Sequence, residues 1–494
     1  MLAETTSFTL EGIAARPIRV EVDIHRGLPS FQIVGLPDAA VREARERVRA
    51  ALVNTGFDFP LRRITANLAP ADLRKAGPGL DLALATGLLV ASGELPTGPL
   101  AGWALAGELA LDGSVRPVRG ALAMTEAARE VSCRGIILPV ANGPEAALAP
   151  GIEVRTIDSI SDLRDFARGR VPGRKPEPAS LASSDSLPDL RDLRGQEGLR
   201  RAIEVAAAGG HALLMVGPPG SGKSLAARRI PSVLPPLTGD EILEVARIAG
   251  VCGSGPMRAQ RPFRAPHHTV SAAGLVGGGS PPRPGEITLA HRGVLFLDEL
   301  CEFRRPALEA LREPMESGEV TISRVNGRRT LPAGFTLIAA ANPCPCGRGD
   351  EDPECGCSPA AIARYKGTLS GALADRIDII AGVAQPDPEA MSGEDGESSV
   401  AVRERVLIAR RRMYERLGTG RPNALATRAE VSQFELESPA RELLVEAGRR
   451  QRLSGRSHDR ILRLARTIAD LDDGGPIREL HLAGALQLRR RSGS

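Results

Sequence analysis

The sequence predicts an α/β protein of three parts: a mixed N-terminal domain, a domain built on a parallel sheet, and a C-terminal helical domain. Between residues 189 and 384, short apolar runs of strand length alternate with helix-like stretches, as successive βαβ units require. Residues 169–188 are rich in Pro, Ser and Gly without apolar periodicity, which is typical of a linker. A second linker-like stretch, acidic and at residues 385–399, precedes a tail at 400–494 that we expect to be helical throughout.

Length and composition are those of a soluble globular protein. The 494 residues give room for roughly three domains of ordinary size, and 42% of them are hydrophobic. The net charge of +4 is too small by itself to indicate nucleic-acid binding, so local arginine clusters matter more. No apolar run approaches the roughly 18 residues needed to span a bilayer, and the N-terminus lacks a signal sequence. We therefore expect a cytoplasmic protein with no membrane partner.

The N-terminal domain is predicted to span residues 1–168. Residues 18–24 alternate between apolar and polar side chains, as a half-buried strand should. Residues 38–54 carry Ala, Val and Leu at helical spacing with arginines on the other face. Two further apolar elements follow at 80–91 and 135–140, which together make this domain mixed α/β.

The second domain contains a phosphate-loop pattern, G-x-x-x-x-G-K-[ST], matched at each fixed position. Its residues are Gly217, Pro218, Pro219, Gly220, Ser221, Gly222, Lys223 and Ser224. An apolar run at 212–216 precedes the pattern and a helix-compatible stretch follows, which is the context that the motif needs. Backbone N–H groups of such a loop wrap a polyphosphate, with Lys223 on the β/γ-phosphates and the Ser224 hydroxyl on Mg²⁺. Lys223 is one of only four lysines in the chain. We predict that the protein binds ATP.

Two carboxylates follow the apolar run at 294–297. Asp298 is predicted to hold Mg²⁺ and Glu299 to orient the attacking water, the two roles that a hydrolytic ATPase requires. The alternative is a helix N-terminus, where acidic residues are favoured in any case. Asn342 follows a further apolar run at 335–341 and can position water near the γ-phosphate, although Asn also ends strands for turn reasons.

Arg376 is a candidate arginine finger that would act on the ATP of a neighbouring subunit. It lies in the segment 373–378, which reads LADRID. The alternative is an ordinary structural Asp–Arg ion pair.

These segments resemble the AAA+ ATPases, and most closely the bacterial magnesium-chelatase-like YifB/ComM family. The resemblance is carried by residues 35–43 (GLPDAAVRE), 261–269 (RPFRAPHHT), 342–347 (NPCPCG), 369–371 (LSG), 375–378 (DRID) and 456–470, and it covers nearly the whole chain. It implies an ATPase core at 189–384 and a helical lid at 400–494. It further implies Asn342 as sensor 1, Arg376 as the trans-acting finger and Arg456 as the sensor-2 arginine. Arg460 and Arg463 lie on or near the same helical face, so the sensor-2 assignment stays open among the three.

The same resemblance implies that residues 1–168 take a Lon-protease-like (ribosomal S5 domain 2-like) fold. That family uses a Ser–Lys dyad with the Ser in a G-P-S-A-G turn. Here the turn at 77–81 reads GPGLD, so Gly79 occupies the nucleophile position, and no lysine lies near 122–124. Without nucleophile or base we predict a scaffold or binding module and not a protease.

Residues 319–330 are predicted to form a β-hairpin around an Asn-Gly turn, with Arg324, Arg328 and Arg329 near its tip. The resemblance implies that this hairpin projects into the pore of a ring. Arginines there would neutralise nucleic-acid phosphates and give salt-sensitive, sequence-independent binding. A solvated basic turn is the alternative.

Four cysteines lie in one short loop: Cys344, Cys346, Cys355 and Cys357. Four thiolates suit tetrahedral, structural Zn²⁺, although the C-x-C spacing is tighter than the usual C-x₂₋₄-C. Reduced thiols without metal are the alternative. The other three cysteines are expected to be small buried apolar residues.

Taken together, these features predict a ring-forming, hexameric, Mg-ATP-dependent motor on single-stranded or branched DNA. By resemblance it would be a helicase that drives branch migration in recombination or natural transformation. One alternative is the motor subunit of a magnesium chelatase, which fits the ATPase half and leaves the N-terminal domain unexplained. Another is an ATP-driven remodeller of proteins.

Overall fold

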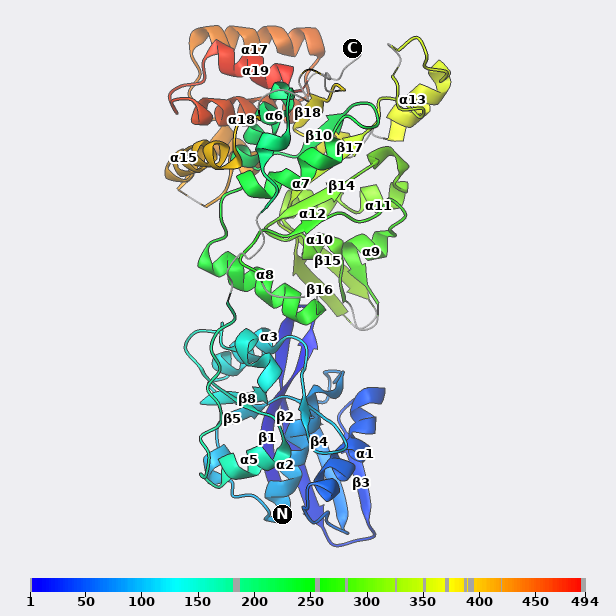
Figure 1. Cartoon of the computed structure of the whole chain (residues 1–494), viewed down its shortest axis with the longest axis vertical. Helices are drawn as coiled ribbons and strands as arrows, with labels where there is room; N and C mark the ends of the chain where they lie inside the picture. Colours follow the sequence, from blue (N-terminus) through cyan, green and yellow to red (C-terminus); the bar gives the residue numbers. More distant parts are fainter. Residues whose placement is uncertain are drawn as a thin grey trace. The chain divides into compact units, whose positions relative to one another are not determined.

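The computed structural model describes residues 2–180, 187–253, 258–279, 283–324, 327–349, 352–368, 373–385, 389, 395–418 and 420–489. The chain divides into two compact units (Figure 1). Unit 1 comprises Met1–Ala182, Gly239–Ala259 and Ser280–Arg283, and unit 2 comprises Ser183–Thr238, Gln260–Gly279 and Pro284–Ser494.

Unit 1 is built on a seven-stranded mixed sheet with the order β3-β4-β2-β1-β5-β8-β9. Its strands are β1 (Leu2–Glu11), β2 (Ala14–His25), β3 (Ser30–Val34), β4 (Arg63–Ala69), β5 (Trp103–Leu105), β8 (Gly135–Pro139) and β9 (Glu153–Ile157). β6 (Glu108–Leu109) and β7 (Val115–Arg116) pair separately. β1 runs antiparallel to β2 and parallel to β5. The strand predicted at 18–24 is confirmed, because Ile18, Val20 and Val22 of β2 are buried in alternation.

The helices of unit 1 are α1 (Ala39–Asn54), α2 (Asp81–Ser92), α3 (Ala121–Glu130), α4 (Gly143–Ala146), α5 (Ile160–Ala167) and α8 (Gly239–Cys252). α1 begins where the sequence predicts, because the Asp38 side chain caps it by accepting from the N–H of Val41 at 2.8 Å. α2 is buried nearly all round and covers β1 and β2. The mixed α/β prediction for this part of the chain is confirmed.

Two segments of unit 1 differ from the predicted boundaries. α8 lies within the predicted ATPase core, yet Arg247 on this helix pairs with Glu126 of α3 through two contacts of 2.7 and 3.0 Å. The predicted linker at 169–188 begins as an edge of the sheet, where Thr156 and Arg174 exchange backbone hydrogen bonds. Residues 181–186 of that linker lie outside the described residues.

Unit 2 is built on a five-stranded sheet with the order β11-β14-β17-β10-β18, parallel throughout. The strands are β10 (Leu213–Val216), β11 (Phe263–Arg264), β14 (Val294–Leu297), β17 (Thr336–Ala341) and β18 (Ile379–Gly382). The three strands predicted at 212–216, 294–297 and 335–341 are confirmed, whereas β11 and β18 were not predicted. Near-continuous apolar runs are expected here because a parallel sheet is covered on both faces.

The remaining elements of unit 2 surround this sheet. They are α6 (Glu197–Gly209), α7 (Lys223–Val233), α9 (Ala272–Val276), α10 (Glu286–Leu289), α11 (Arg305–Glu309), α12 (Arg312–Ser317), β15 (Glu319–Arg324), β16 (Gly327–Pro332), α13 (Pro359–Thr368), α15 (Ser399–Leu417), α16 (Arg428–Val431), α17 (Ser438–Gln451), α18 (Gly455–Leu471) and α19 (Glu479–Gln487). The predicted helical tail is confirmed by α15 to α19. Val406 of α15 and Ile461 of α18 share one hydrophobic core with Ile338 of β17, so these helices pack onto the sheet.

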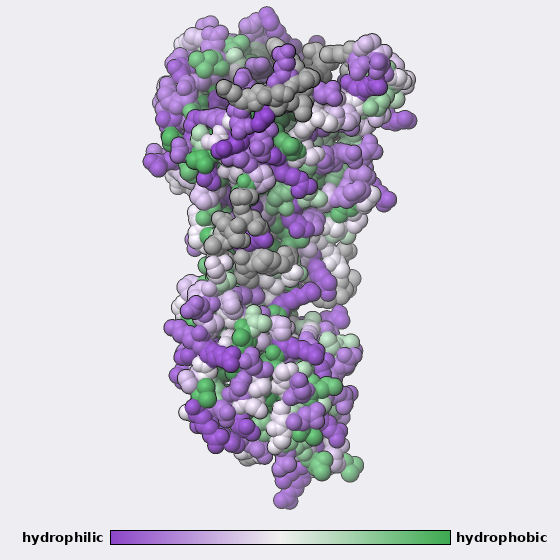
Figure 2. All heavy atoms as spheres, in the orientation of Figure 1, coloured by the Kyte–Doolittle hydropathy of each residue, from purple (hydrophilic) through white to green (hydrophobic). Residues whose placement is uncertain are grey.

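Hydrophilic residues predominate on the face shown in Figure 2, and apolar residues there are scattered in small groups. Such scattered apolar residues are ordinary on a globular surface. Within the part of the chain that the structure describes, no helix is long and apolar enough to cross a bilayer.

Candidate active site

The phosphate-loop segment joins the end of β10 to the start of α7, as its context predicted. Gly220 and Gly222 have φ angles of +78° and +91°, a region that side chains rarely adopt. Gly217 is needed for another reason, because a Cβ there would lie 2.1 Å from the carbonyl oxygen of Val383. Val383 follows β18 and donates its own N–H to Val216 at 2.8 Å. The neighbouring strand therefore fixes where the loop begins.

Lys223 and Asn342 meet at this loop. The buried ammonium of Lys223 donates to the carbonyl oxygens of Gly217 (2.6 Å) and Pro218 (2.8 Å). It also lies 3.3 Å from Oδ1 of Asn342, which directly follows β17. Burial lowers the pKa of Lys223, while the negative charge of Asp298 acts in the opposite direction. The lysine and the candidate sensor are thus in position to share one phosphate.

Asp298 and Glu299 follow β14, at the same carboxyl edge of the sheet as the loop. The Ser224 hydroxyl donates to Oδ2 of Asp298 at 2.6 Å. A hydroxyl and a carboxylate in contact are the oxygen ligands that phosphate-loop proteins offer to Mg²⁺. Glu299 has a φ of +50°, a left-handed conformation that costs a non-glycine residue about 1–2 kcal/mol. Strain of this kind clusters at functional sites.

His268 is a residue of this site that the sequence analysis gave no role. Its Nδ1 lies 3.2 Å from Oε2 of Glu299. β11 pairs in parallel with β14, so the residues after β11 lie beside those after β14. The rings of His267 and His268 are in contact, with centroids 4.1 Å apart and planes tilted by 36°. Sequence reasoning could not find this contact, because the two-residue strand β11 that brings the histidines here was not predicted.

A cavity of about 360 Å³ opens beside the loop. Its lining residues are Asp192, Leu193, Arg194, Gln196, Gly220, Ser221, Gly222 and Leu225. Gln196 ties the cavity wall to the loop by donating to the carbonyl oxygens of Ser221 (3.2 Å) and Ala384 (2.9 Å). Leu193 and Leu225 add apolar surface beside these polar groups, a combination that is typical of small-ligand sites. Sequence reasoning missed this wall because residues 190–196 carry no recognisable motif.

Arg376 lies at the opposite, amino edge of the sheet. It precedes β18, whose first residue, Ile379, pairs with Leu213 at the start of β10. The loop follows Val216 at the other end of β10, so the length of that strand, about 10 Å, separates the two edges. Arg376 therefore lies away from the phosphate loop of its own chain.

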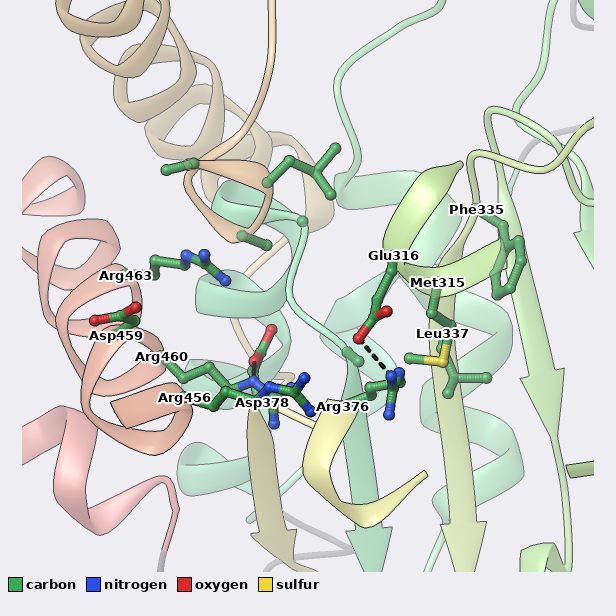
Figure 3. A pocket seen from close by; sticks show the side chains of 15 residues that line it. Met315, Glu316, Phe335, Leu337, Arg376, Asp378, Arg456, Asp459, Arg460 and Arg463 are labelled. Atoms are coloured by element: carbon green, nitrogen blue, oxygen red, sulfur yellow. Dashed lines mark hydrogen bonds and ion pairs between the residues drawn. The ribbon is translucent and has the colours of Figure 1, made fainter. Parts of the chain in front are cut away.

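A second cavity, of about 340 Å³, lies at this amino edge (Figure 3). It is lined by Gly210, Ala212, Met315, Glu316, Phe335, Leu337, Arg376, Asp378, Ala424, Leu425, Ala426, Arg456, Asp459, Arg460 and Arg463. The three arginines of α18 that share the sensor-2 assignment thus lie with Arg376. Nε of Arg460 is 3.7 Å from Asp378, so this arginine already has an ion-pair partner within the chain.

Among the contacts of the described residues, Arg376 forms an ion pair with Glu316 of α12. Nη2 of Arg376 donates to Oε1 of Glu316, as the dashed line in Figure 3 marks. The Arg376 side chain is 6% exposed and that of Glu316 is 58% exposed. The predicted finger is therefore turned inward and held by an acidic side chain at the surface.

Cys344, Cys346, Cys355 and Cys357 form a cluster, with their sulfur atoms all within 4.8 Å of one another. Three of the Sγ–Sγ distances are 3.3, 3.7 and 3.6 Å. Four sulfurs around a tetrahedral Zn²⁺ at 2.3 Å lie about 3.8 Å apart, so this set has the right dimensions. The N–H of Arg348 and bonds from neighbouring thiols lower the pKa of Cys346 to about 6. The N–H of Cys357 lowers the pKa of Cys355, but burial and the bonds that its thiol donates raise it to about 12.

The cysteine loop touches the phosphate loop. Gly347 has a φ of +87°, and a Cβ there would lie 2.6 Å from Cδ of Pro219. The loop also begins directly after Asn342, with Pro343 and then Cys344. The geometry of the cysteine cluster is therefore connected to the phosphate loop and to Asn342 at the same time.

The predicted hairpin is present as β15 and β16, with Arg324 paired to Gly327. Arg328 is exposed, whereas Arg329 is half-buried and pairs across from the buried Ile322. Neighbouring residues of a strand point to opposite faces, so Arg328 and Arg329 do not form one cluster. Residues 325–326 at the turn and the Arg324 side chain lie outside the described part.

In unit 1, Gly79 at the expected nucleophile position lies beside Met124, which belongs to the segment 122–124 near which the resemblance implies the lysine. A Cβ added at Gly79 would lie 4.0 Å from Cε of Met124 and 3.6 Å from a methyl carbon of Val118. The surroundings of Gly79 are thus apolar. Lys75 is fully buried and donates from Nζ to the carbonyl oxygen of Pro70.

Three family profiles match the chain. They are "Subunit ChlI of Mg-chelatase" at residues 20–142, "Magnesium chelatase, subunit ChlI" at 189–391, and "Magnesium chelatase, subunit ChlI C-terminal" at 396–489. The uncharacterized protein YifB of Salmonella typhimurium is 43% identical over 491 residues, 97% of this chain and 95% of its own length. The uncharacterized protein Rv2897c of Mycobacterium tuberculosis is 44% identical over 481 residues, 95% of each chain. Competence protein ComM of Haemophilus influenzae is 41% identical over 492 residues, 97% of this chain and 95% of its own length.

Proposed function

The chain belongs to the magnesium-chelatase-like family of YifB and ComM, and from this premise we propose that it is a Mg-ATP-driven ring motor that branch-migrates DNA. A family of this kind is expected to use ATP and Mg²⁺. The observation that carries the proposal is the position of Arg376, at the sheet edge opposite to the phosphate loop of the same chain. A finger in that position completes an ATP site only when a second subunit supplies the phosphates.

In the proposed reaction, water attacks the γ-phosphorus and the bond to the β–γ bridging oxygen breaks, which releases phosphate and ADP. Lys223 neutralises the phosphates, Glu299 orients and deprotonates the water, and Asn342 positions it. Ser224 and Asp298 would hold Mg²⁺, which neutralises phosphate charge when it is bound. His268, in contact with Glu299, orients that carboxylate in the same way that third groups orient catalytic bases.

The proposed assembly is a ring, hexameric as the resemblance implies. A finger that reaches the next subunit makes a head-to-tail interface, and such interfaces close into rings. Arg456 lines the cavity of Arg376, so we propose that it acts on the same neighbouring nucleotide. Arg460 is engaged by Asp378. Arg456 and Arg463 both line the cavity, and we propose Arg456 as sensor 2 because the resemblance implies it.

DNA is the polymer along which we propose that the ring moves. The hairpin β15–β16 carries Arg324, Arg328 and Arg329, and basic pore elements grip nucleic-acid backbones without reading sequence. One relative is named a competence protein, and we propose for this chain a role in recombination of incoming DNA. The proposed location is the cytoplasm. Unit 1 would then be a scaffold or binding module with a Lon-like fold and no protease activity.

We further propose structural Zn²⁺ on the four cysteines. Their number and the sulfur–sulfur distances suit a closed tetrahedral site. The ion would order the loop that touches Pro219 and would have no part in the reaction itself.

The family profiles favour one second candidate, a motor subunit of magnesium chelatase. ATP hydrolysis with and without a four-way DNA junction, at low and moderate salt, separates the two candidates. The DNA motor predicts a junction-stimulated rate that falls steeply with salt, together with ATP-dependent conversion of the junction to duplex products. If no DNA structure binds or changes the rate, the DNA proposal is wrong, and the chelatase motor and the protein remodeller remain as the alternatives.

A further inference from the structure

We infer that Glu316 is a positioning residue that holds Arg376 back from the neighbouring active site and links its release to the hairpin β15–β16. The inference rests on the proposed ring ATPase and goes beyond it, because it assigns a resting position to the finger and a device that releases it.

The resting position follows from burial. The Arg376 side chain is 6% exposed, whereas a finger must present its N–H donors to a phosphate outside its own subunit. In the close-up of Figure 3, the guanidinium of Arg376 faces Glu316. For Arg376 to reach a neighbour, this ion pair must open and the side chain must turn outward.

The charges around Arg376 identify Glu316 as the group that opposes this movement. Burial lowers the pKa of Arg376, and the positive charges of Arg312 and Arg460 lower it further, while Glu316 acts against all three. Asp378, which lines the same cavity, is bonded to His211 at 3.1 Å and paired with Arg460. When the charge of Glu316 is removed, the positive charges of Arg312 and Arg460 repel Arg376 without that opposing attraction, which weakens its inward position.

The link to the hairpin runs through the end of α12. Glu316 and Ser317 are the last two residues of that helix, and β15 starts at Glu319. The Ser317 hydroxyl lies within hydrogen-bond distance of the carbonyl oxygens of Glu313 (3.0 Å) and Glu319 (2.9 Å). The N–H of Ala333, just past β16, donates to Gly318 at 2.7 Å. Both strands of the hairpin are therefore fastened to the end of the helix that carries Glu316.

DNA that binds and displaces the hairpin would thus change the position of Arg376 in the same subunit. Through Arg376 it would affect ATP hydrolysis in the next subunit. Opening the ion pair is a two-state step, and DNA on the hairpin shifts the balance only if it favours the open state. Thermodynamic linkage requires the reverse effect as well. When Arg376 contacts the ATP of the next subunit, the affinity of the hairpin for DNA should therefore increase.

The test compares Glu316→Gln with Glu313→Gln, a matched change one turn earlier on the exposed side of α12. Without DNA, we expect Glu316→Gln to raise kcat about two- to fivefold at unchanged KM. This factor corresponds to the free energy of an ion pair with one exposed partner, which would no longer stabilise the inward position of Arg376. In this variant, the ratio of the ATPase rates with and without DNA should fall toward one. Glu313→Gln and the charge-keeping Glu316→Asp should stay near wild type, with melting temperatures unchanged for all three.

The double variant Glu316→Gln/Arg376→Ala should be as inactive as Arg376→Ala alone, because Glu316 acts only through the finger. An unchanged or lowered kcat in Glu316→Gln would overturn the inference, and so would full activity of Arg376→Ala. If DNA neither binds to the wild-type protein nor changes its ATPase rate, the DNA proposal and the link to the hairpin are both wrong. The DNA-free comparison still decides whether Glu316 restrains Arg376.

Discussion

The amide oxygen of Asn342 lies 3.3 Å from the ammonium nitrogen of Lys223, although 119 residues separate the two in sequence. The parallel pairing of β10 with β17 brings them together, since each residue follows the carboxyl end of its strand. The same edge carries Asp298 and Glu299 after β14. One sheet edge thus assembles the groups that an ATPase requires.

Lys223→Ala should reduce ATP turnover by at least about a hundredfold, because a buried donor to the phosphates is lost. Steady-state phosphate release measures the effect. Lys175→Ala, an exposed lysine of unit 1, serves as the control and should be neutral. A Lys223→Ala protein that turns over at the wild-type rate would remove the phosphate-loop assignment.

Glu299→Gln should bind ATP normally and hydrolyse it about a hundredfold more slowly, since the amide cannot take the proton of the attacking water. Nucleotide binding at equilibrium and single-turnover hydrolysis separate the two steps. Glu302→Gln, at an exposed position three residues later, is the matched control. Normal hydrolysis by Glu299→Gln would exclude this residue as the base.

Gly217→Ala should destabilise unit 2 by about 1–3 kcal/mol, because its Cβ would overlap the carbonyl oxygen of Val383. Gly198→Ala, in α6 and with no atom near its added Cβ, should be neutral or stabilising by up to about 1 kcal/mol. Thermal unfolding of both variants checks the contrast. Equal melting temperatures would mean that the loop does not begin against Val383.

Purified protein should contain about one Zn²⁺ per chain, as a closed four-thiolate site does. Cys344→Ser or Cys355→Ser should lose the metal and weaken nucleotide binding, because Gly347 between the cysteines touches Pro219. Cys133→Ser, which changes a cysteine outside the cluster, should retain the metal. Metal analysis that finds far less than one equivalent in wild type would remove the site.

Local patterns predicted the parts of the fold that depend on local chemistry. The glycines around Lys223 and the apolar runs before Asp298 and Asn342 are visible in any single window of sequence. Parallel pairing then follows, because buried strands separated by helices have few other ways to pack.

Other features depend on contacts that no local window contains. His268 reaches Glu299 only because the two-residue strand β11 pairs with β14. Glu316 meets Arg376 across 60 residues, and both residue types are common on any surface. α8 packs on α3 through Arg247 and Glu126, although its position in the sequence suggested the other unit.

The central claim is that Arg376 completes the ATP site of the next subunit, and mixing two inactive variants tests it most directly. Lys223→Ala keeps the finger and Arg376→Ala keeps the phosphate loop, and each alone should be inactive. In a 1:1 mixture that assembles randomly, about a quarter of the head-to-tail interfaces regain both groups, so about a quarter of wild-type hydrolysis should return. If the mixture forms rings and stays inactive, Arg376 does not act across the subunit interface and the account is wrong.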